Sequence, residues 1–102
     1  MVIVVGTIQV DPARRDEFLA EQAEDFAAGR AEPGCLEYGL LIDPEQPDRV
    51  RLLERWADVP SFEAHLQALT ARAAEGKMPM ASDAVRGMEI IRHDVASISK
   101  LA

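Results

Sequence analysis

The apolar run from Val2 to Val10 constrains the fold more than any other segment, because it carries β-branched residues almost throughout. It predicts the first β-strand. Apolar residues fall on both of its faces, with Val2, Val4, Ile8 and Val10 on one and Ile3 and Val5 on the other, joined by Thr7 and Gln9. A strand with one solvated face would alternate apolar and polar residues. We therefore expect this strand to be covered on both sides for most of its length.

A first helix is predicted from Asp11-Pro12 to about Arg30. Aspartate can cap the free amides of a helix, and proline is tolerated at the first helical position. At 100° per residue, one face of this helix gathers Phe18, Leu19, Gln22, Ala23 and Phe26. The helix should end at Glu32-Pro33-Gly34, because proline disfavours helix at the residue before it and glycine permits a turn.

The rest of the chain predicts three strands and a second helix. Two strands, Cys35 to Ile42 and Val50 to Trp56, flank a polar hairpin loop with two prolines. Asp58 is expected to cap a helix that runs through Ser61 to about Glu75. Its predicted buried stripe consists of Phe62, Leu66, Leu69 and Ala73. The last strand is expected from Val85 to Val95.

The resulting order is β-α-β-β-α-β, the ferredoxin-like arrangement of the α+β class. We expect one domain over residues 1–102, with a four-stranded antiparallel sheet and two helices on one face. The other face is too apolar to be solvated, as the first strand shows. The simplest solution is a homodimer that packs sheet against sheet with two-fold symmetry.

Composition excludes several classes of function. The net charge of -7 argues against nucleic acid and against anionic membrane surfaces. No apolar run approaches the roughly 20 residues of a transmembrane helix. The N-terminal residues lack the basic region and cleavage site of a signal peptide. A single cysteine excludes an intrachain disulfide and fits a reducing compartment, so we expect a cytoplasmic protein.

Three residues could form a site at the seam between helix and sheet. His65 lies at the edge of the second helix's apolar stripe, and its imidazole could take a proton from a phenol or simply hydrogen-bond a backbone carbonyl. Trp56 could stack on an aromatic substrate or serve as a core residue. Tyr38, expected on the same face as Leu36 and Leu40, could donate its hydroxyl to a substrate oxygen or anchor the dimer.

Glu54 shares a face with Leu52 and Trp56, and a carboxylate there needs a partner if it is buried. Possible partners are Arg51, Arg55, Arg86 and Arg92. We expect a salt bridge between subunits rather than a part in catalysis.

Other chemistry finds little support in the sequence. Cys35 has no basic cluster nearby and is expected to be inert. Two histidines and one cysteine, widely spaced, do not make a metal site. No glycine-rich phosphate loop is present, so flavin and nicotinamide are not expected as cofactors.

Three segments together resemble the antibiotic biosynthesis monooxygenase (ABM) family of dimeric α+β barrel proteins. They are Glu32-Pro33-Gly34-Cys35-Leu36-Glu37-Tyr38, Glu54-Arg55-Trp56-Ala57-Asp58 and Phe62-Glu63-Ala64-His65. Enzymes of that family oxidise electron-rich phenols or quinols with molecular oxygen and without metal, flavin or other prosthetic group. The resemblance implies His65 as base or substrate hydrogen-bonder, Trp56 and Tyr38 as pocket wall, and Arg86 as anion stabiliser.

The chain departs from the family pattern in two places. Many relatives carry a second histidine about four residues after the first, where this chain has Leu69-Thr70. The haem-degrading branch uses an asparagine on the first strand and a histidine late in the second helix. This chain has Gly6-Thr7 and Ala71-Arg72-Ala73-Ala74 there, so haem degradation is not expected.

Three functions remain compatible with the sequence. The first is a cofactor-independent monooxygenase acting on quinols or polycyclic phenols. The second is a non-catalytic dimeric barrel that binds a small hydrophobic ligand. The third is an isomerase or cyclase on the same fold. A fold alone does not choose among them.

Overall fold

The computed structural model describes residues 1–102. The elements follow the order β1 (Val2–Val10), α1 (Arg15–Arg30), β2 (Cys35–Ile42), β3 (Arg49–Trp56), α2 (Val59–Ala74) and β4 (Val85–Asp94). A single 3₁₀ turn, Pro12–Arg14, precedes α1. The predicted β-α-β-β-α-β order is confirmed. Neither helix is long and apolar enough to cross a bilayer.

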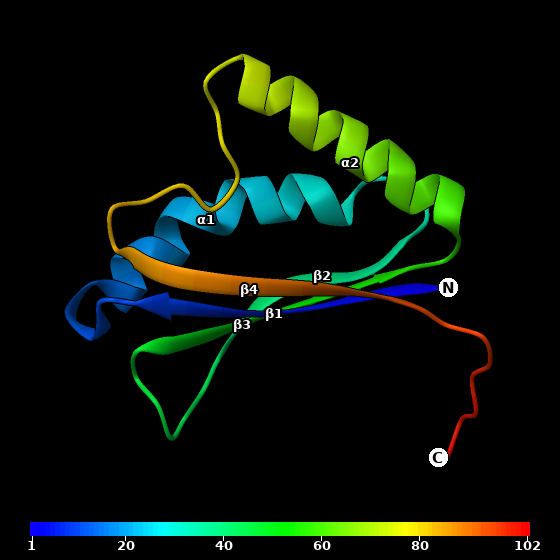
Figure 1. Cartoon of the computed structure of the whole chain (residues 1–102), viewed down its shortest axis with the longest axis horizontal. Coiled ribbons are helices and arrows are strands. Elements are labelled where there is room, and N and C mark those ends of the chain that lie inside the picture. Colours follow the sequence, from blue (N-terminus) through cyan, green and yellow to red (C-terminus); the bar gives the residue numbers. More distant parts are fainter.

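The four strands form one antiparallel sheet in the order β2-β3-β1-β4, and both helices lie on the same side of it (Figure 1). The ferredoxin-like α+β fold is thus confirmed. β1 sits in the middle, and its register places Val2 opposite Trp56 on β3 and opposite Asp94 on β4. The helix-facing core contains Val2, Val4, Ile8, Val10, Phe18, Phe26, Tyr38, Val50, Leu52, Trp56, Phe62 and Ala84.

The predicted cap of the second helix is present, since Asp58 accepts a hydrogen bond from the amide of Ser61 at 2.8 Å. Asp11 accepts one from the amide of Ala13 and caps the 3₁₀ turn, whereas α1 itself begins after Arg14 without a side-chain cap. α1 buries Phe18, Gln22, Phe26 and Gly29. Leu19 is only half-buried and Ala23 is exposed, so the helix meets the sheet through a narrower face than predicted.

Two expectations about side-chain direction are wrong. The pairing of β2 with β3 shifts between Cys35 and Glu37, so Leu36 occupies a bulge and is exposed instead of sharing the face of Tyr38. On α2, His65 is buried and Leu66 is exposed. The contact face is therefore set by Phe62 and His65, which pack on the end of β3, while the helix rises away from the sheet beyond them (Figure 1).

Candidate functional site

His65 is the centre of a buried polar cluster between α2 and the sheet. Only 2% of the residue is exposed. Its ring stacks on Trp56 with centroids 4.5 Å apart, and Tyr38 meets it edge-on at 5.0 Å. Three of the four predicted site residues thus lie together, because β2 and β3 are neighbours and α2 begins directly after β3.

A carboxylate lies on each side of the imidazole. Nδ1 of His65 is 2.7 Å from Oε2 of Glu32, and Nε2 is 3.6 Å from Oε1 of Glu54. Oε1 of Glu54 also accepts a hydrogen bond from Nε1 of Trp56 at 2.9 Å. Nε2 of His65 is buried without a hydrogen-bond partner.

The prediction that Glu54 forms a salt bridge with an arginine of a second subunit is wrong. Its side chain points to the helix side of the sheet, where it meets Trp56 and His65 rather than an arginine or a second subunit. Glu32 was predicted as the end of a helix and as part of a family segment, without a role in the site, and its contact with His65 was missed. Glu32 and His65 are 33 positions apart, and no local pattern reports a contact over that separation.

Arg86 does not join this cluster. It lies in β4 between Val85 and Gly87, which pair with the end of β1, whereas Trp56 pairs with the start of β1. Its guanidinium is exposed, 3.6 Å from the carboxylate of Asp11. Arg86, predicted as an anion stabiliser, and His65 therefore lie at opposite ends of the sheet within one chain.

The turn after α1 fixes Glu32 against His65. Gly34 has φ +79°, and a Cβ there would lie 2.1 Å from Oγ of Ser61. The carbonyl of Gly34 accepts a hydrogen bond from the amide of Ala57 at 2.9 Å. Ser61 lies four residues before His65, on the same side of α2. The segment Glu32-Pro33-Gly34 therefore contacts the side of α2 that carries the imidazole.

Burial decides the ionisation of the surrounding groups. It raises the pKa of Glu54, although the Trp56 indole N–H and the nearby His65 favour the carboxylate. It also raises the pKa of Tyr38 far above its usual range, and the charges of Glu54 and Glu32 add to that effect. Burial likewise raises the pKa of the Cys35 thiol. Tyr38 and Cys35 are therefore neutral near pH 7, as expected for pocket walls rather than nucleophiles.

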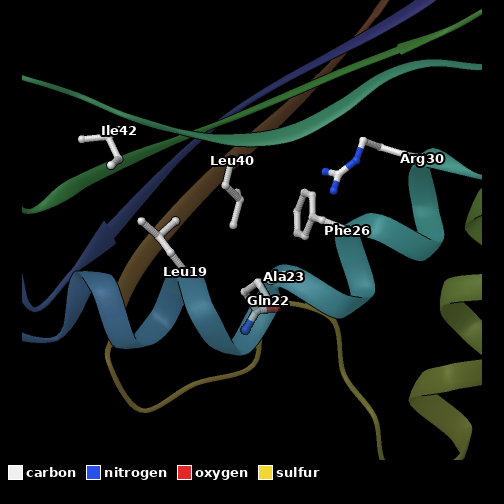
Figure 2. Close-up of a pocket in the computed structure, with 7 residues that line it drawn as sticks. All are labelled: Leu19, Gln22, Ala23, Phe26, Arg30, Leu40 and Ile42. Carbon is white, nitrogen blue, oxygen red and sulfur yellow. The ribbon is translucent and has the colours of Figure 1, made fainter.

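Two hollows lie near this cluster. One, of about 280 Å³, is lined by Glu32, Pro33, Pro60, Ser61, Ala64 and His65. The other is a groove of about 270 Å³ between α1 and β2, lined by Leu19, Gln22, Ala23, Phe26, Arg30, Leu40 and Ile42 (Figure 2). The Phe26 and Tyr38 rings, 4.4 Å apart, stand between this groove and His65. The first hollow, called the Glu32 cleft below, touches titratable groups, and the second, the α1–β2 groove, is mainly apolar.

Comparison with known proteins identifies related sequences. A family model described as "Antibiotic biosynthesis monooxygenase" matches residues 1–77. YcnE of Bacillus subtilis, provisionally described as a monooxygenase, is 30% identical over 80 residues, which cover 74% of this chain and 84% of YcnE. The uncharacterised protein sll1783 of Synechocystis is 29% identical over 66 residues, or 65% of this chain and only 45% of that protein.

Solved structures show the same fold at lower identity. The haem degrader MhuD of Mycobacterium tuberculosis superposes with a TM-score of 0.71 and 21% identity, covering 98% of this chain and 100% of MhuD. A protein of Nitrosomonas europaea, provisionally described as an antibiotic biosynthesis monooxygenase, gives a TM-score of 0.74 at 17% identity, covering 95% and 100% of the two chains. The family model spans three quarters of the sequence, and on that ground the chain belongs to the antibiotic biosynthesis monooxygenase family.

Proposed function

We propose that this protein is a cofactor-independent monooxygenase that oxidises quinols or electron-rich polycyclic phenols with molecular oxygen. The observation that carries the proposal is the buried His65, which is hydrogen-bonded to the Glu32 carboxylate and adjoins the Glu32 cleft. Family membership and the relationship to YcnE support monooxygenase chemistry. The substrate class comes from the family resemblance and is part of the proposal.

Each residue of the cluster has a separate role in the proposed reaction. His65, with the carboxylate bonded to it, provides the base or substrate hydrogen bond that helps to remove a phenolic proton. Trp56 and Tyr38 form the rigid wall behind the imidazole. The phenolate formed in this way is electron-rich and can itself reduce oxygen, so the protein needs only a cleft, a base and a few hydrogen bonds.

Haem fits this arrangement poorly. Both ring nitrogens of His65 face carboxylates, and Nε2 is fully enclosed. His93, the other histidine, lies opposite Ile3 on β1 and is exposed on the outer side of the sheet, away from the site. Neither imidazole is placed to ligate an iron in the Glu32 cleft.

Oxygen uptake with a panel of dihydroquinones and anthrone-type phenols tests the proposed reaction. The His65→Ala variant should lower kcat/KM by about 10²- to 10⁴-fold, because it removes the imidazole on which proton removal at this site depends, directly or through Glu32. Gln67→Ala, at an exposed position of α2, is the control and should keep the wild-type rate. Uptake no faster than autoxidation for the wild-type protein, or equal rates in wild type and His65→Ala, would contradict the proposal.

The α1–β2 groove supports a second candidate function, the binding of a small hydrophobic ligand without reaction. Its walls are mainly Leu19, Phe26 and Leu40, and it contains no group that titrates near neutral pH (Figure 2). An Ala23→Trp substitution would fill the groove. Loss of hydrophobic-dye binding in that variant, together with an absence of oxygen uptake by the wild type, would favour this second function.

We also propose that the protein is a homodimer joined through the outer face of the sheet. Leu53, Val5 and Ile91 form one apolar row across β3, β1 and β4 on that face. Charged residues flank the row, including the ion pair of Arg55 and Glu37 at 2.9 Å. An apolar centre with a polar rim is the usual composition of a protein interface.

A further inference from the structure

Glu32 and His65, which are hydrogen-bonded to each other, differ in their exposure to solvent. His65 is 2% exposed, whereas the Glu32 side chain is 24% exposed and lines the Glu32 cleft. Only one Glu32 oxygen, Oε2, bonds to His65, and Oε1 accepts no hydrogen bond from the protein. A ligand hydroxyl entering the cleft can therefore reach the carboxylate, while Nδ1 of the imidazole is already engaged and Nε2 faces the interior.

We propose that Glu32 is the catalytic residue that takes the phenolic proton, and that His65 is a positioning residue acting through it. This inference rests on the proposed function and names the proton acceptor of that same site. In the step, the phenolic O–H bond breaks and a new O–H bond forms on the Glu32 carboxylate. The substrate oxygen keeps the electron pair as phenolate, and molecular oxygen is the oxidant in the later steps.

The surroundings fit a hydrogen bond donated by His65 to Glu32. Nδ1 lies within hydrogen-bond distance of a carboxylate that meets no lysine or arginine, so an N–H at Nδ1 would hold Glu32 in place. Glu54 lies on the far side of the ring, 3.6 Å from Nε2, and Trp56, stacked on the ring, restricts the plane of the imidazole. The other titratable groups packed here, Tyr38 and Cys35 on β2, stay neutral because burial raises their pKa values.

The His65→Asn variant distinguishes Glu32 from His65 as the proton acceptor. Its side-chain amide can donate a hydrogen bond to Glu32 much as Nδ1 does, but it does not accept a proton near neutral pH. Glu32→Gln removes the carboxylate and retains the volume, and Glu32→Asp restores a carboxylate one methylene shorter. Glu24→Gln, on the exposed side of α1, is the matched control.

Steady-state oxygen uptake across pH gives the first measurement. We expect Glu32→Gln to lose about 10²- to 10⁴-fold in kcat/KM together with the acidic limb of the pH profile. Glu32→Asp should recover part of both, and His65→Asn should keep most of the rate and the acidic limb. Loss of activity in His65→Asn with retention in Glu32→Gln would overturn the inference, as would equal loss in both.

Binding of 4-nitrophenol gives a second measurement that needs no turnover. Before the proton moves, the neutral phenol donates a hydrogen bond to the Glu32 carboxylate, whose negative charge disfavours phenolate. The absorbance of bound 4-nitrophenol should therefore report a pKa raised by about one unit over free 4-nitrophenol. The shift should vanish in Glu32→Gln and persist in His65→Asn. An unshifted or lowered pKa in the wild type, or no binding, would overturn the inference. A shift without oxygen uptake would sustain Glu32 while refuting the monooxygenase.

Discussion

Glu54 is a carboxyl group whose position opposes its ionisation. It is buried on the helix side of β3 and receives one hydrogen bond, from the indole of Trp56. Burial raises its pKa, and the charge of Glu32 adds to that effect, whereas Trp56 and His65 work in the opposite direction. Its folded-state pKa is raised above the usual value of 4.5. The folded state is therefore most stable when Glu54 is protonated, and ionisation of Glu54 lowers the free energy of unfolding.

A Glu54→Gln variant tests this electrostatic assignment. Glutamine still accepts the Trp56 hydrogen bond but cannot ionise. The wild type should lose stability as the pH rises from the unfolded-state value of 4.5 through the raised folded-state pKa, and the variant should lack that loss. The difference in free energy of unfolding should therefore favour the variant increasingly between pH 4 and pH 8 in urea titrations. A difference that does not change with pH would show that Glu54 is not destabilised by its ionisation.

The sequence predicted single residues well where a local pattern determines their direction. Strand alternation placed Trp56 and Glu54 on one face, and helical spacing placed His65 at the edge of the packing face. The contact with Glu32 was not predictable in this way, because it depends on how the turn after α1 lies against α2. Arg86 was assigned to the site because of its positive charge. The pairing register of β1 with β4, which was not known from the sequence, places it at the other end of the sheet.

At the scale of elements, the turn of Glu32, Pro33 and Gly34 joins the two helices to the sheet. It ends α1, starts β2 and contacts the first turn of α2 through Ser61. A glycine is required at position 34 both by the positive φ and by the approach of Ser61. The same turn carries the proposed proton acceptor, so its conformation determines the position of the Glu32 carboxylate.

Substitution of two glycines with the same backbone conformation separates these effects. Gly76 has φ +80°, and no atom lies within 4 Å of the place that a Cβ would occupy, so Gly76→Ala should lose only the conformational term of about 1–2 kcal/mol. Gly34→Ala adds a Cβ 2.1 Å from Oγ of Ser61 and should lose about 1–3 kcal/mol more. Chemical denaturation measures both. Equal losses in the two variants would show that the contact with Ser61 is not a constraint on the turn.

The order and approximate ends of the elements were predictable because caps and breakers act locally. Asp11-Pro12, Pro33-Gly34 and Asp58 mark boundaries that the structure places within a few residues of the expected positions. The bulge at Leu36 was not predictable, because one extra residue inverts the alternation without changing the composition. The contact face of α2 also differed, since packing of His65 on Trp56 outweighed the apolar spacing that favoured Leu66.

At the scale of the whole molecule, the two faces of the sheet differ in what covers them. Both helices pack on one face, and the opposite face remains open along its length (Figure 1). On the open face Leu41 is 49% exposed and Ile91 is 46% exposed. Burial of apolar surface contributes about 25 cal/mol per Å². A second copy placed face to face would therefore remove the free-energy cost of exposing these side chains to water. β1 alone already indicates such a cover, because both of its faces are apolar.

Neighbouring isoleucines on β4 provide the test of the dimer. Ile91 lies in the apolar row with Val5, whereas Ile90 is 42% exposed and points to the helix side, opposite Gly6. A charge at position 91 would be desolvated in a sheet-to-sheet interface without a partner. Ile91→Asp should therefore shift the mass measured by light scattering from dimer to monomer, and Ile90→Asp should leave the dimer intact, provided that both variants retain the circular dichroism of the folded chain. A monomeric wild-type protein, or a dimer unaffected by Ile91→Asp and broken by Ile90→Asp, would place any interface elsewhere and leave the open face of the sheet without its proposed cover.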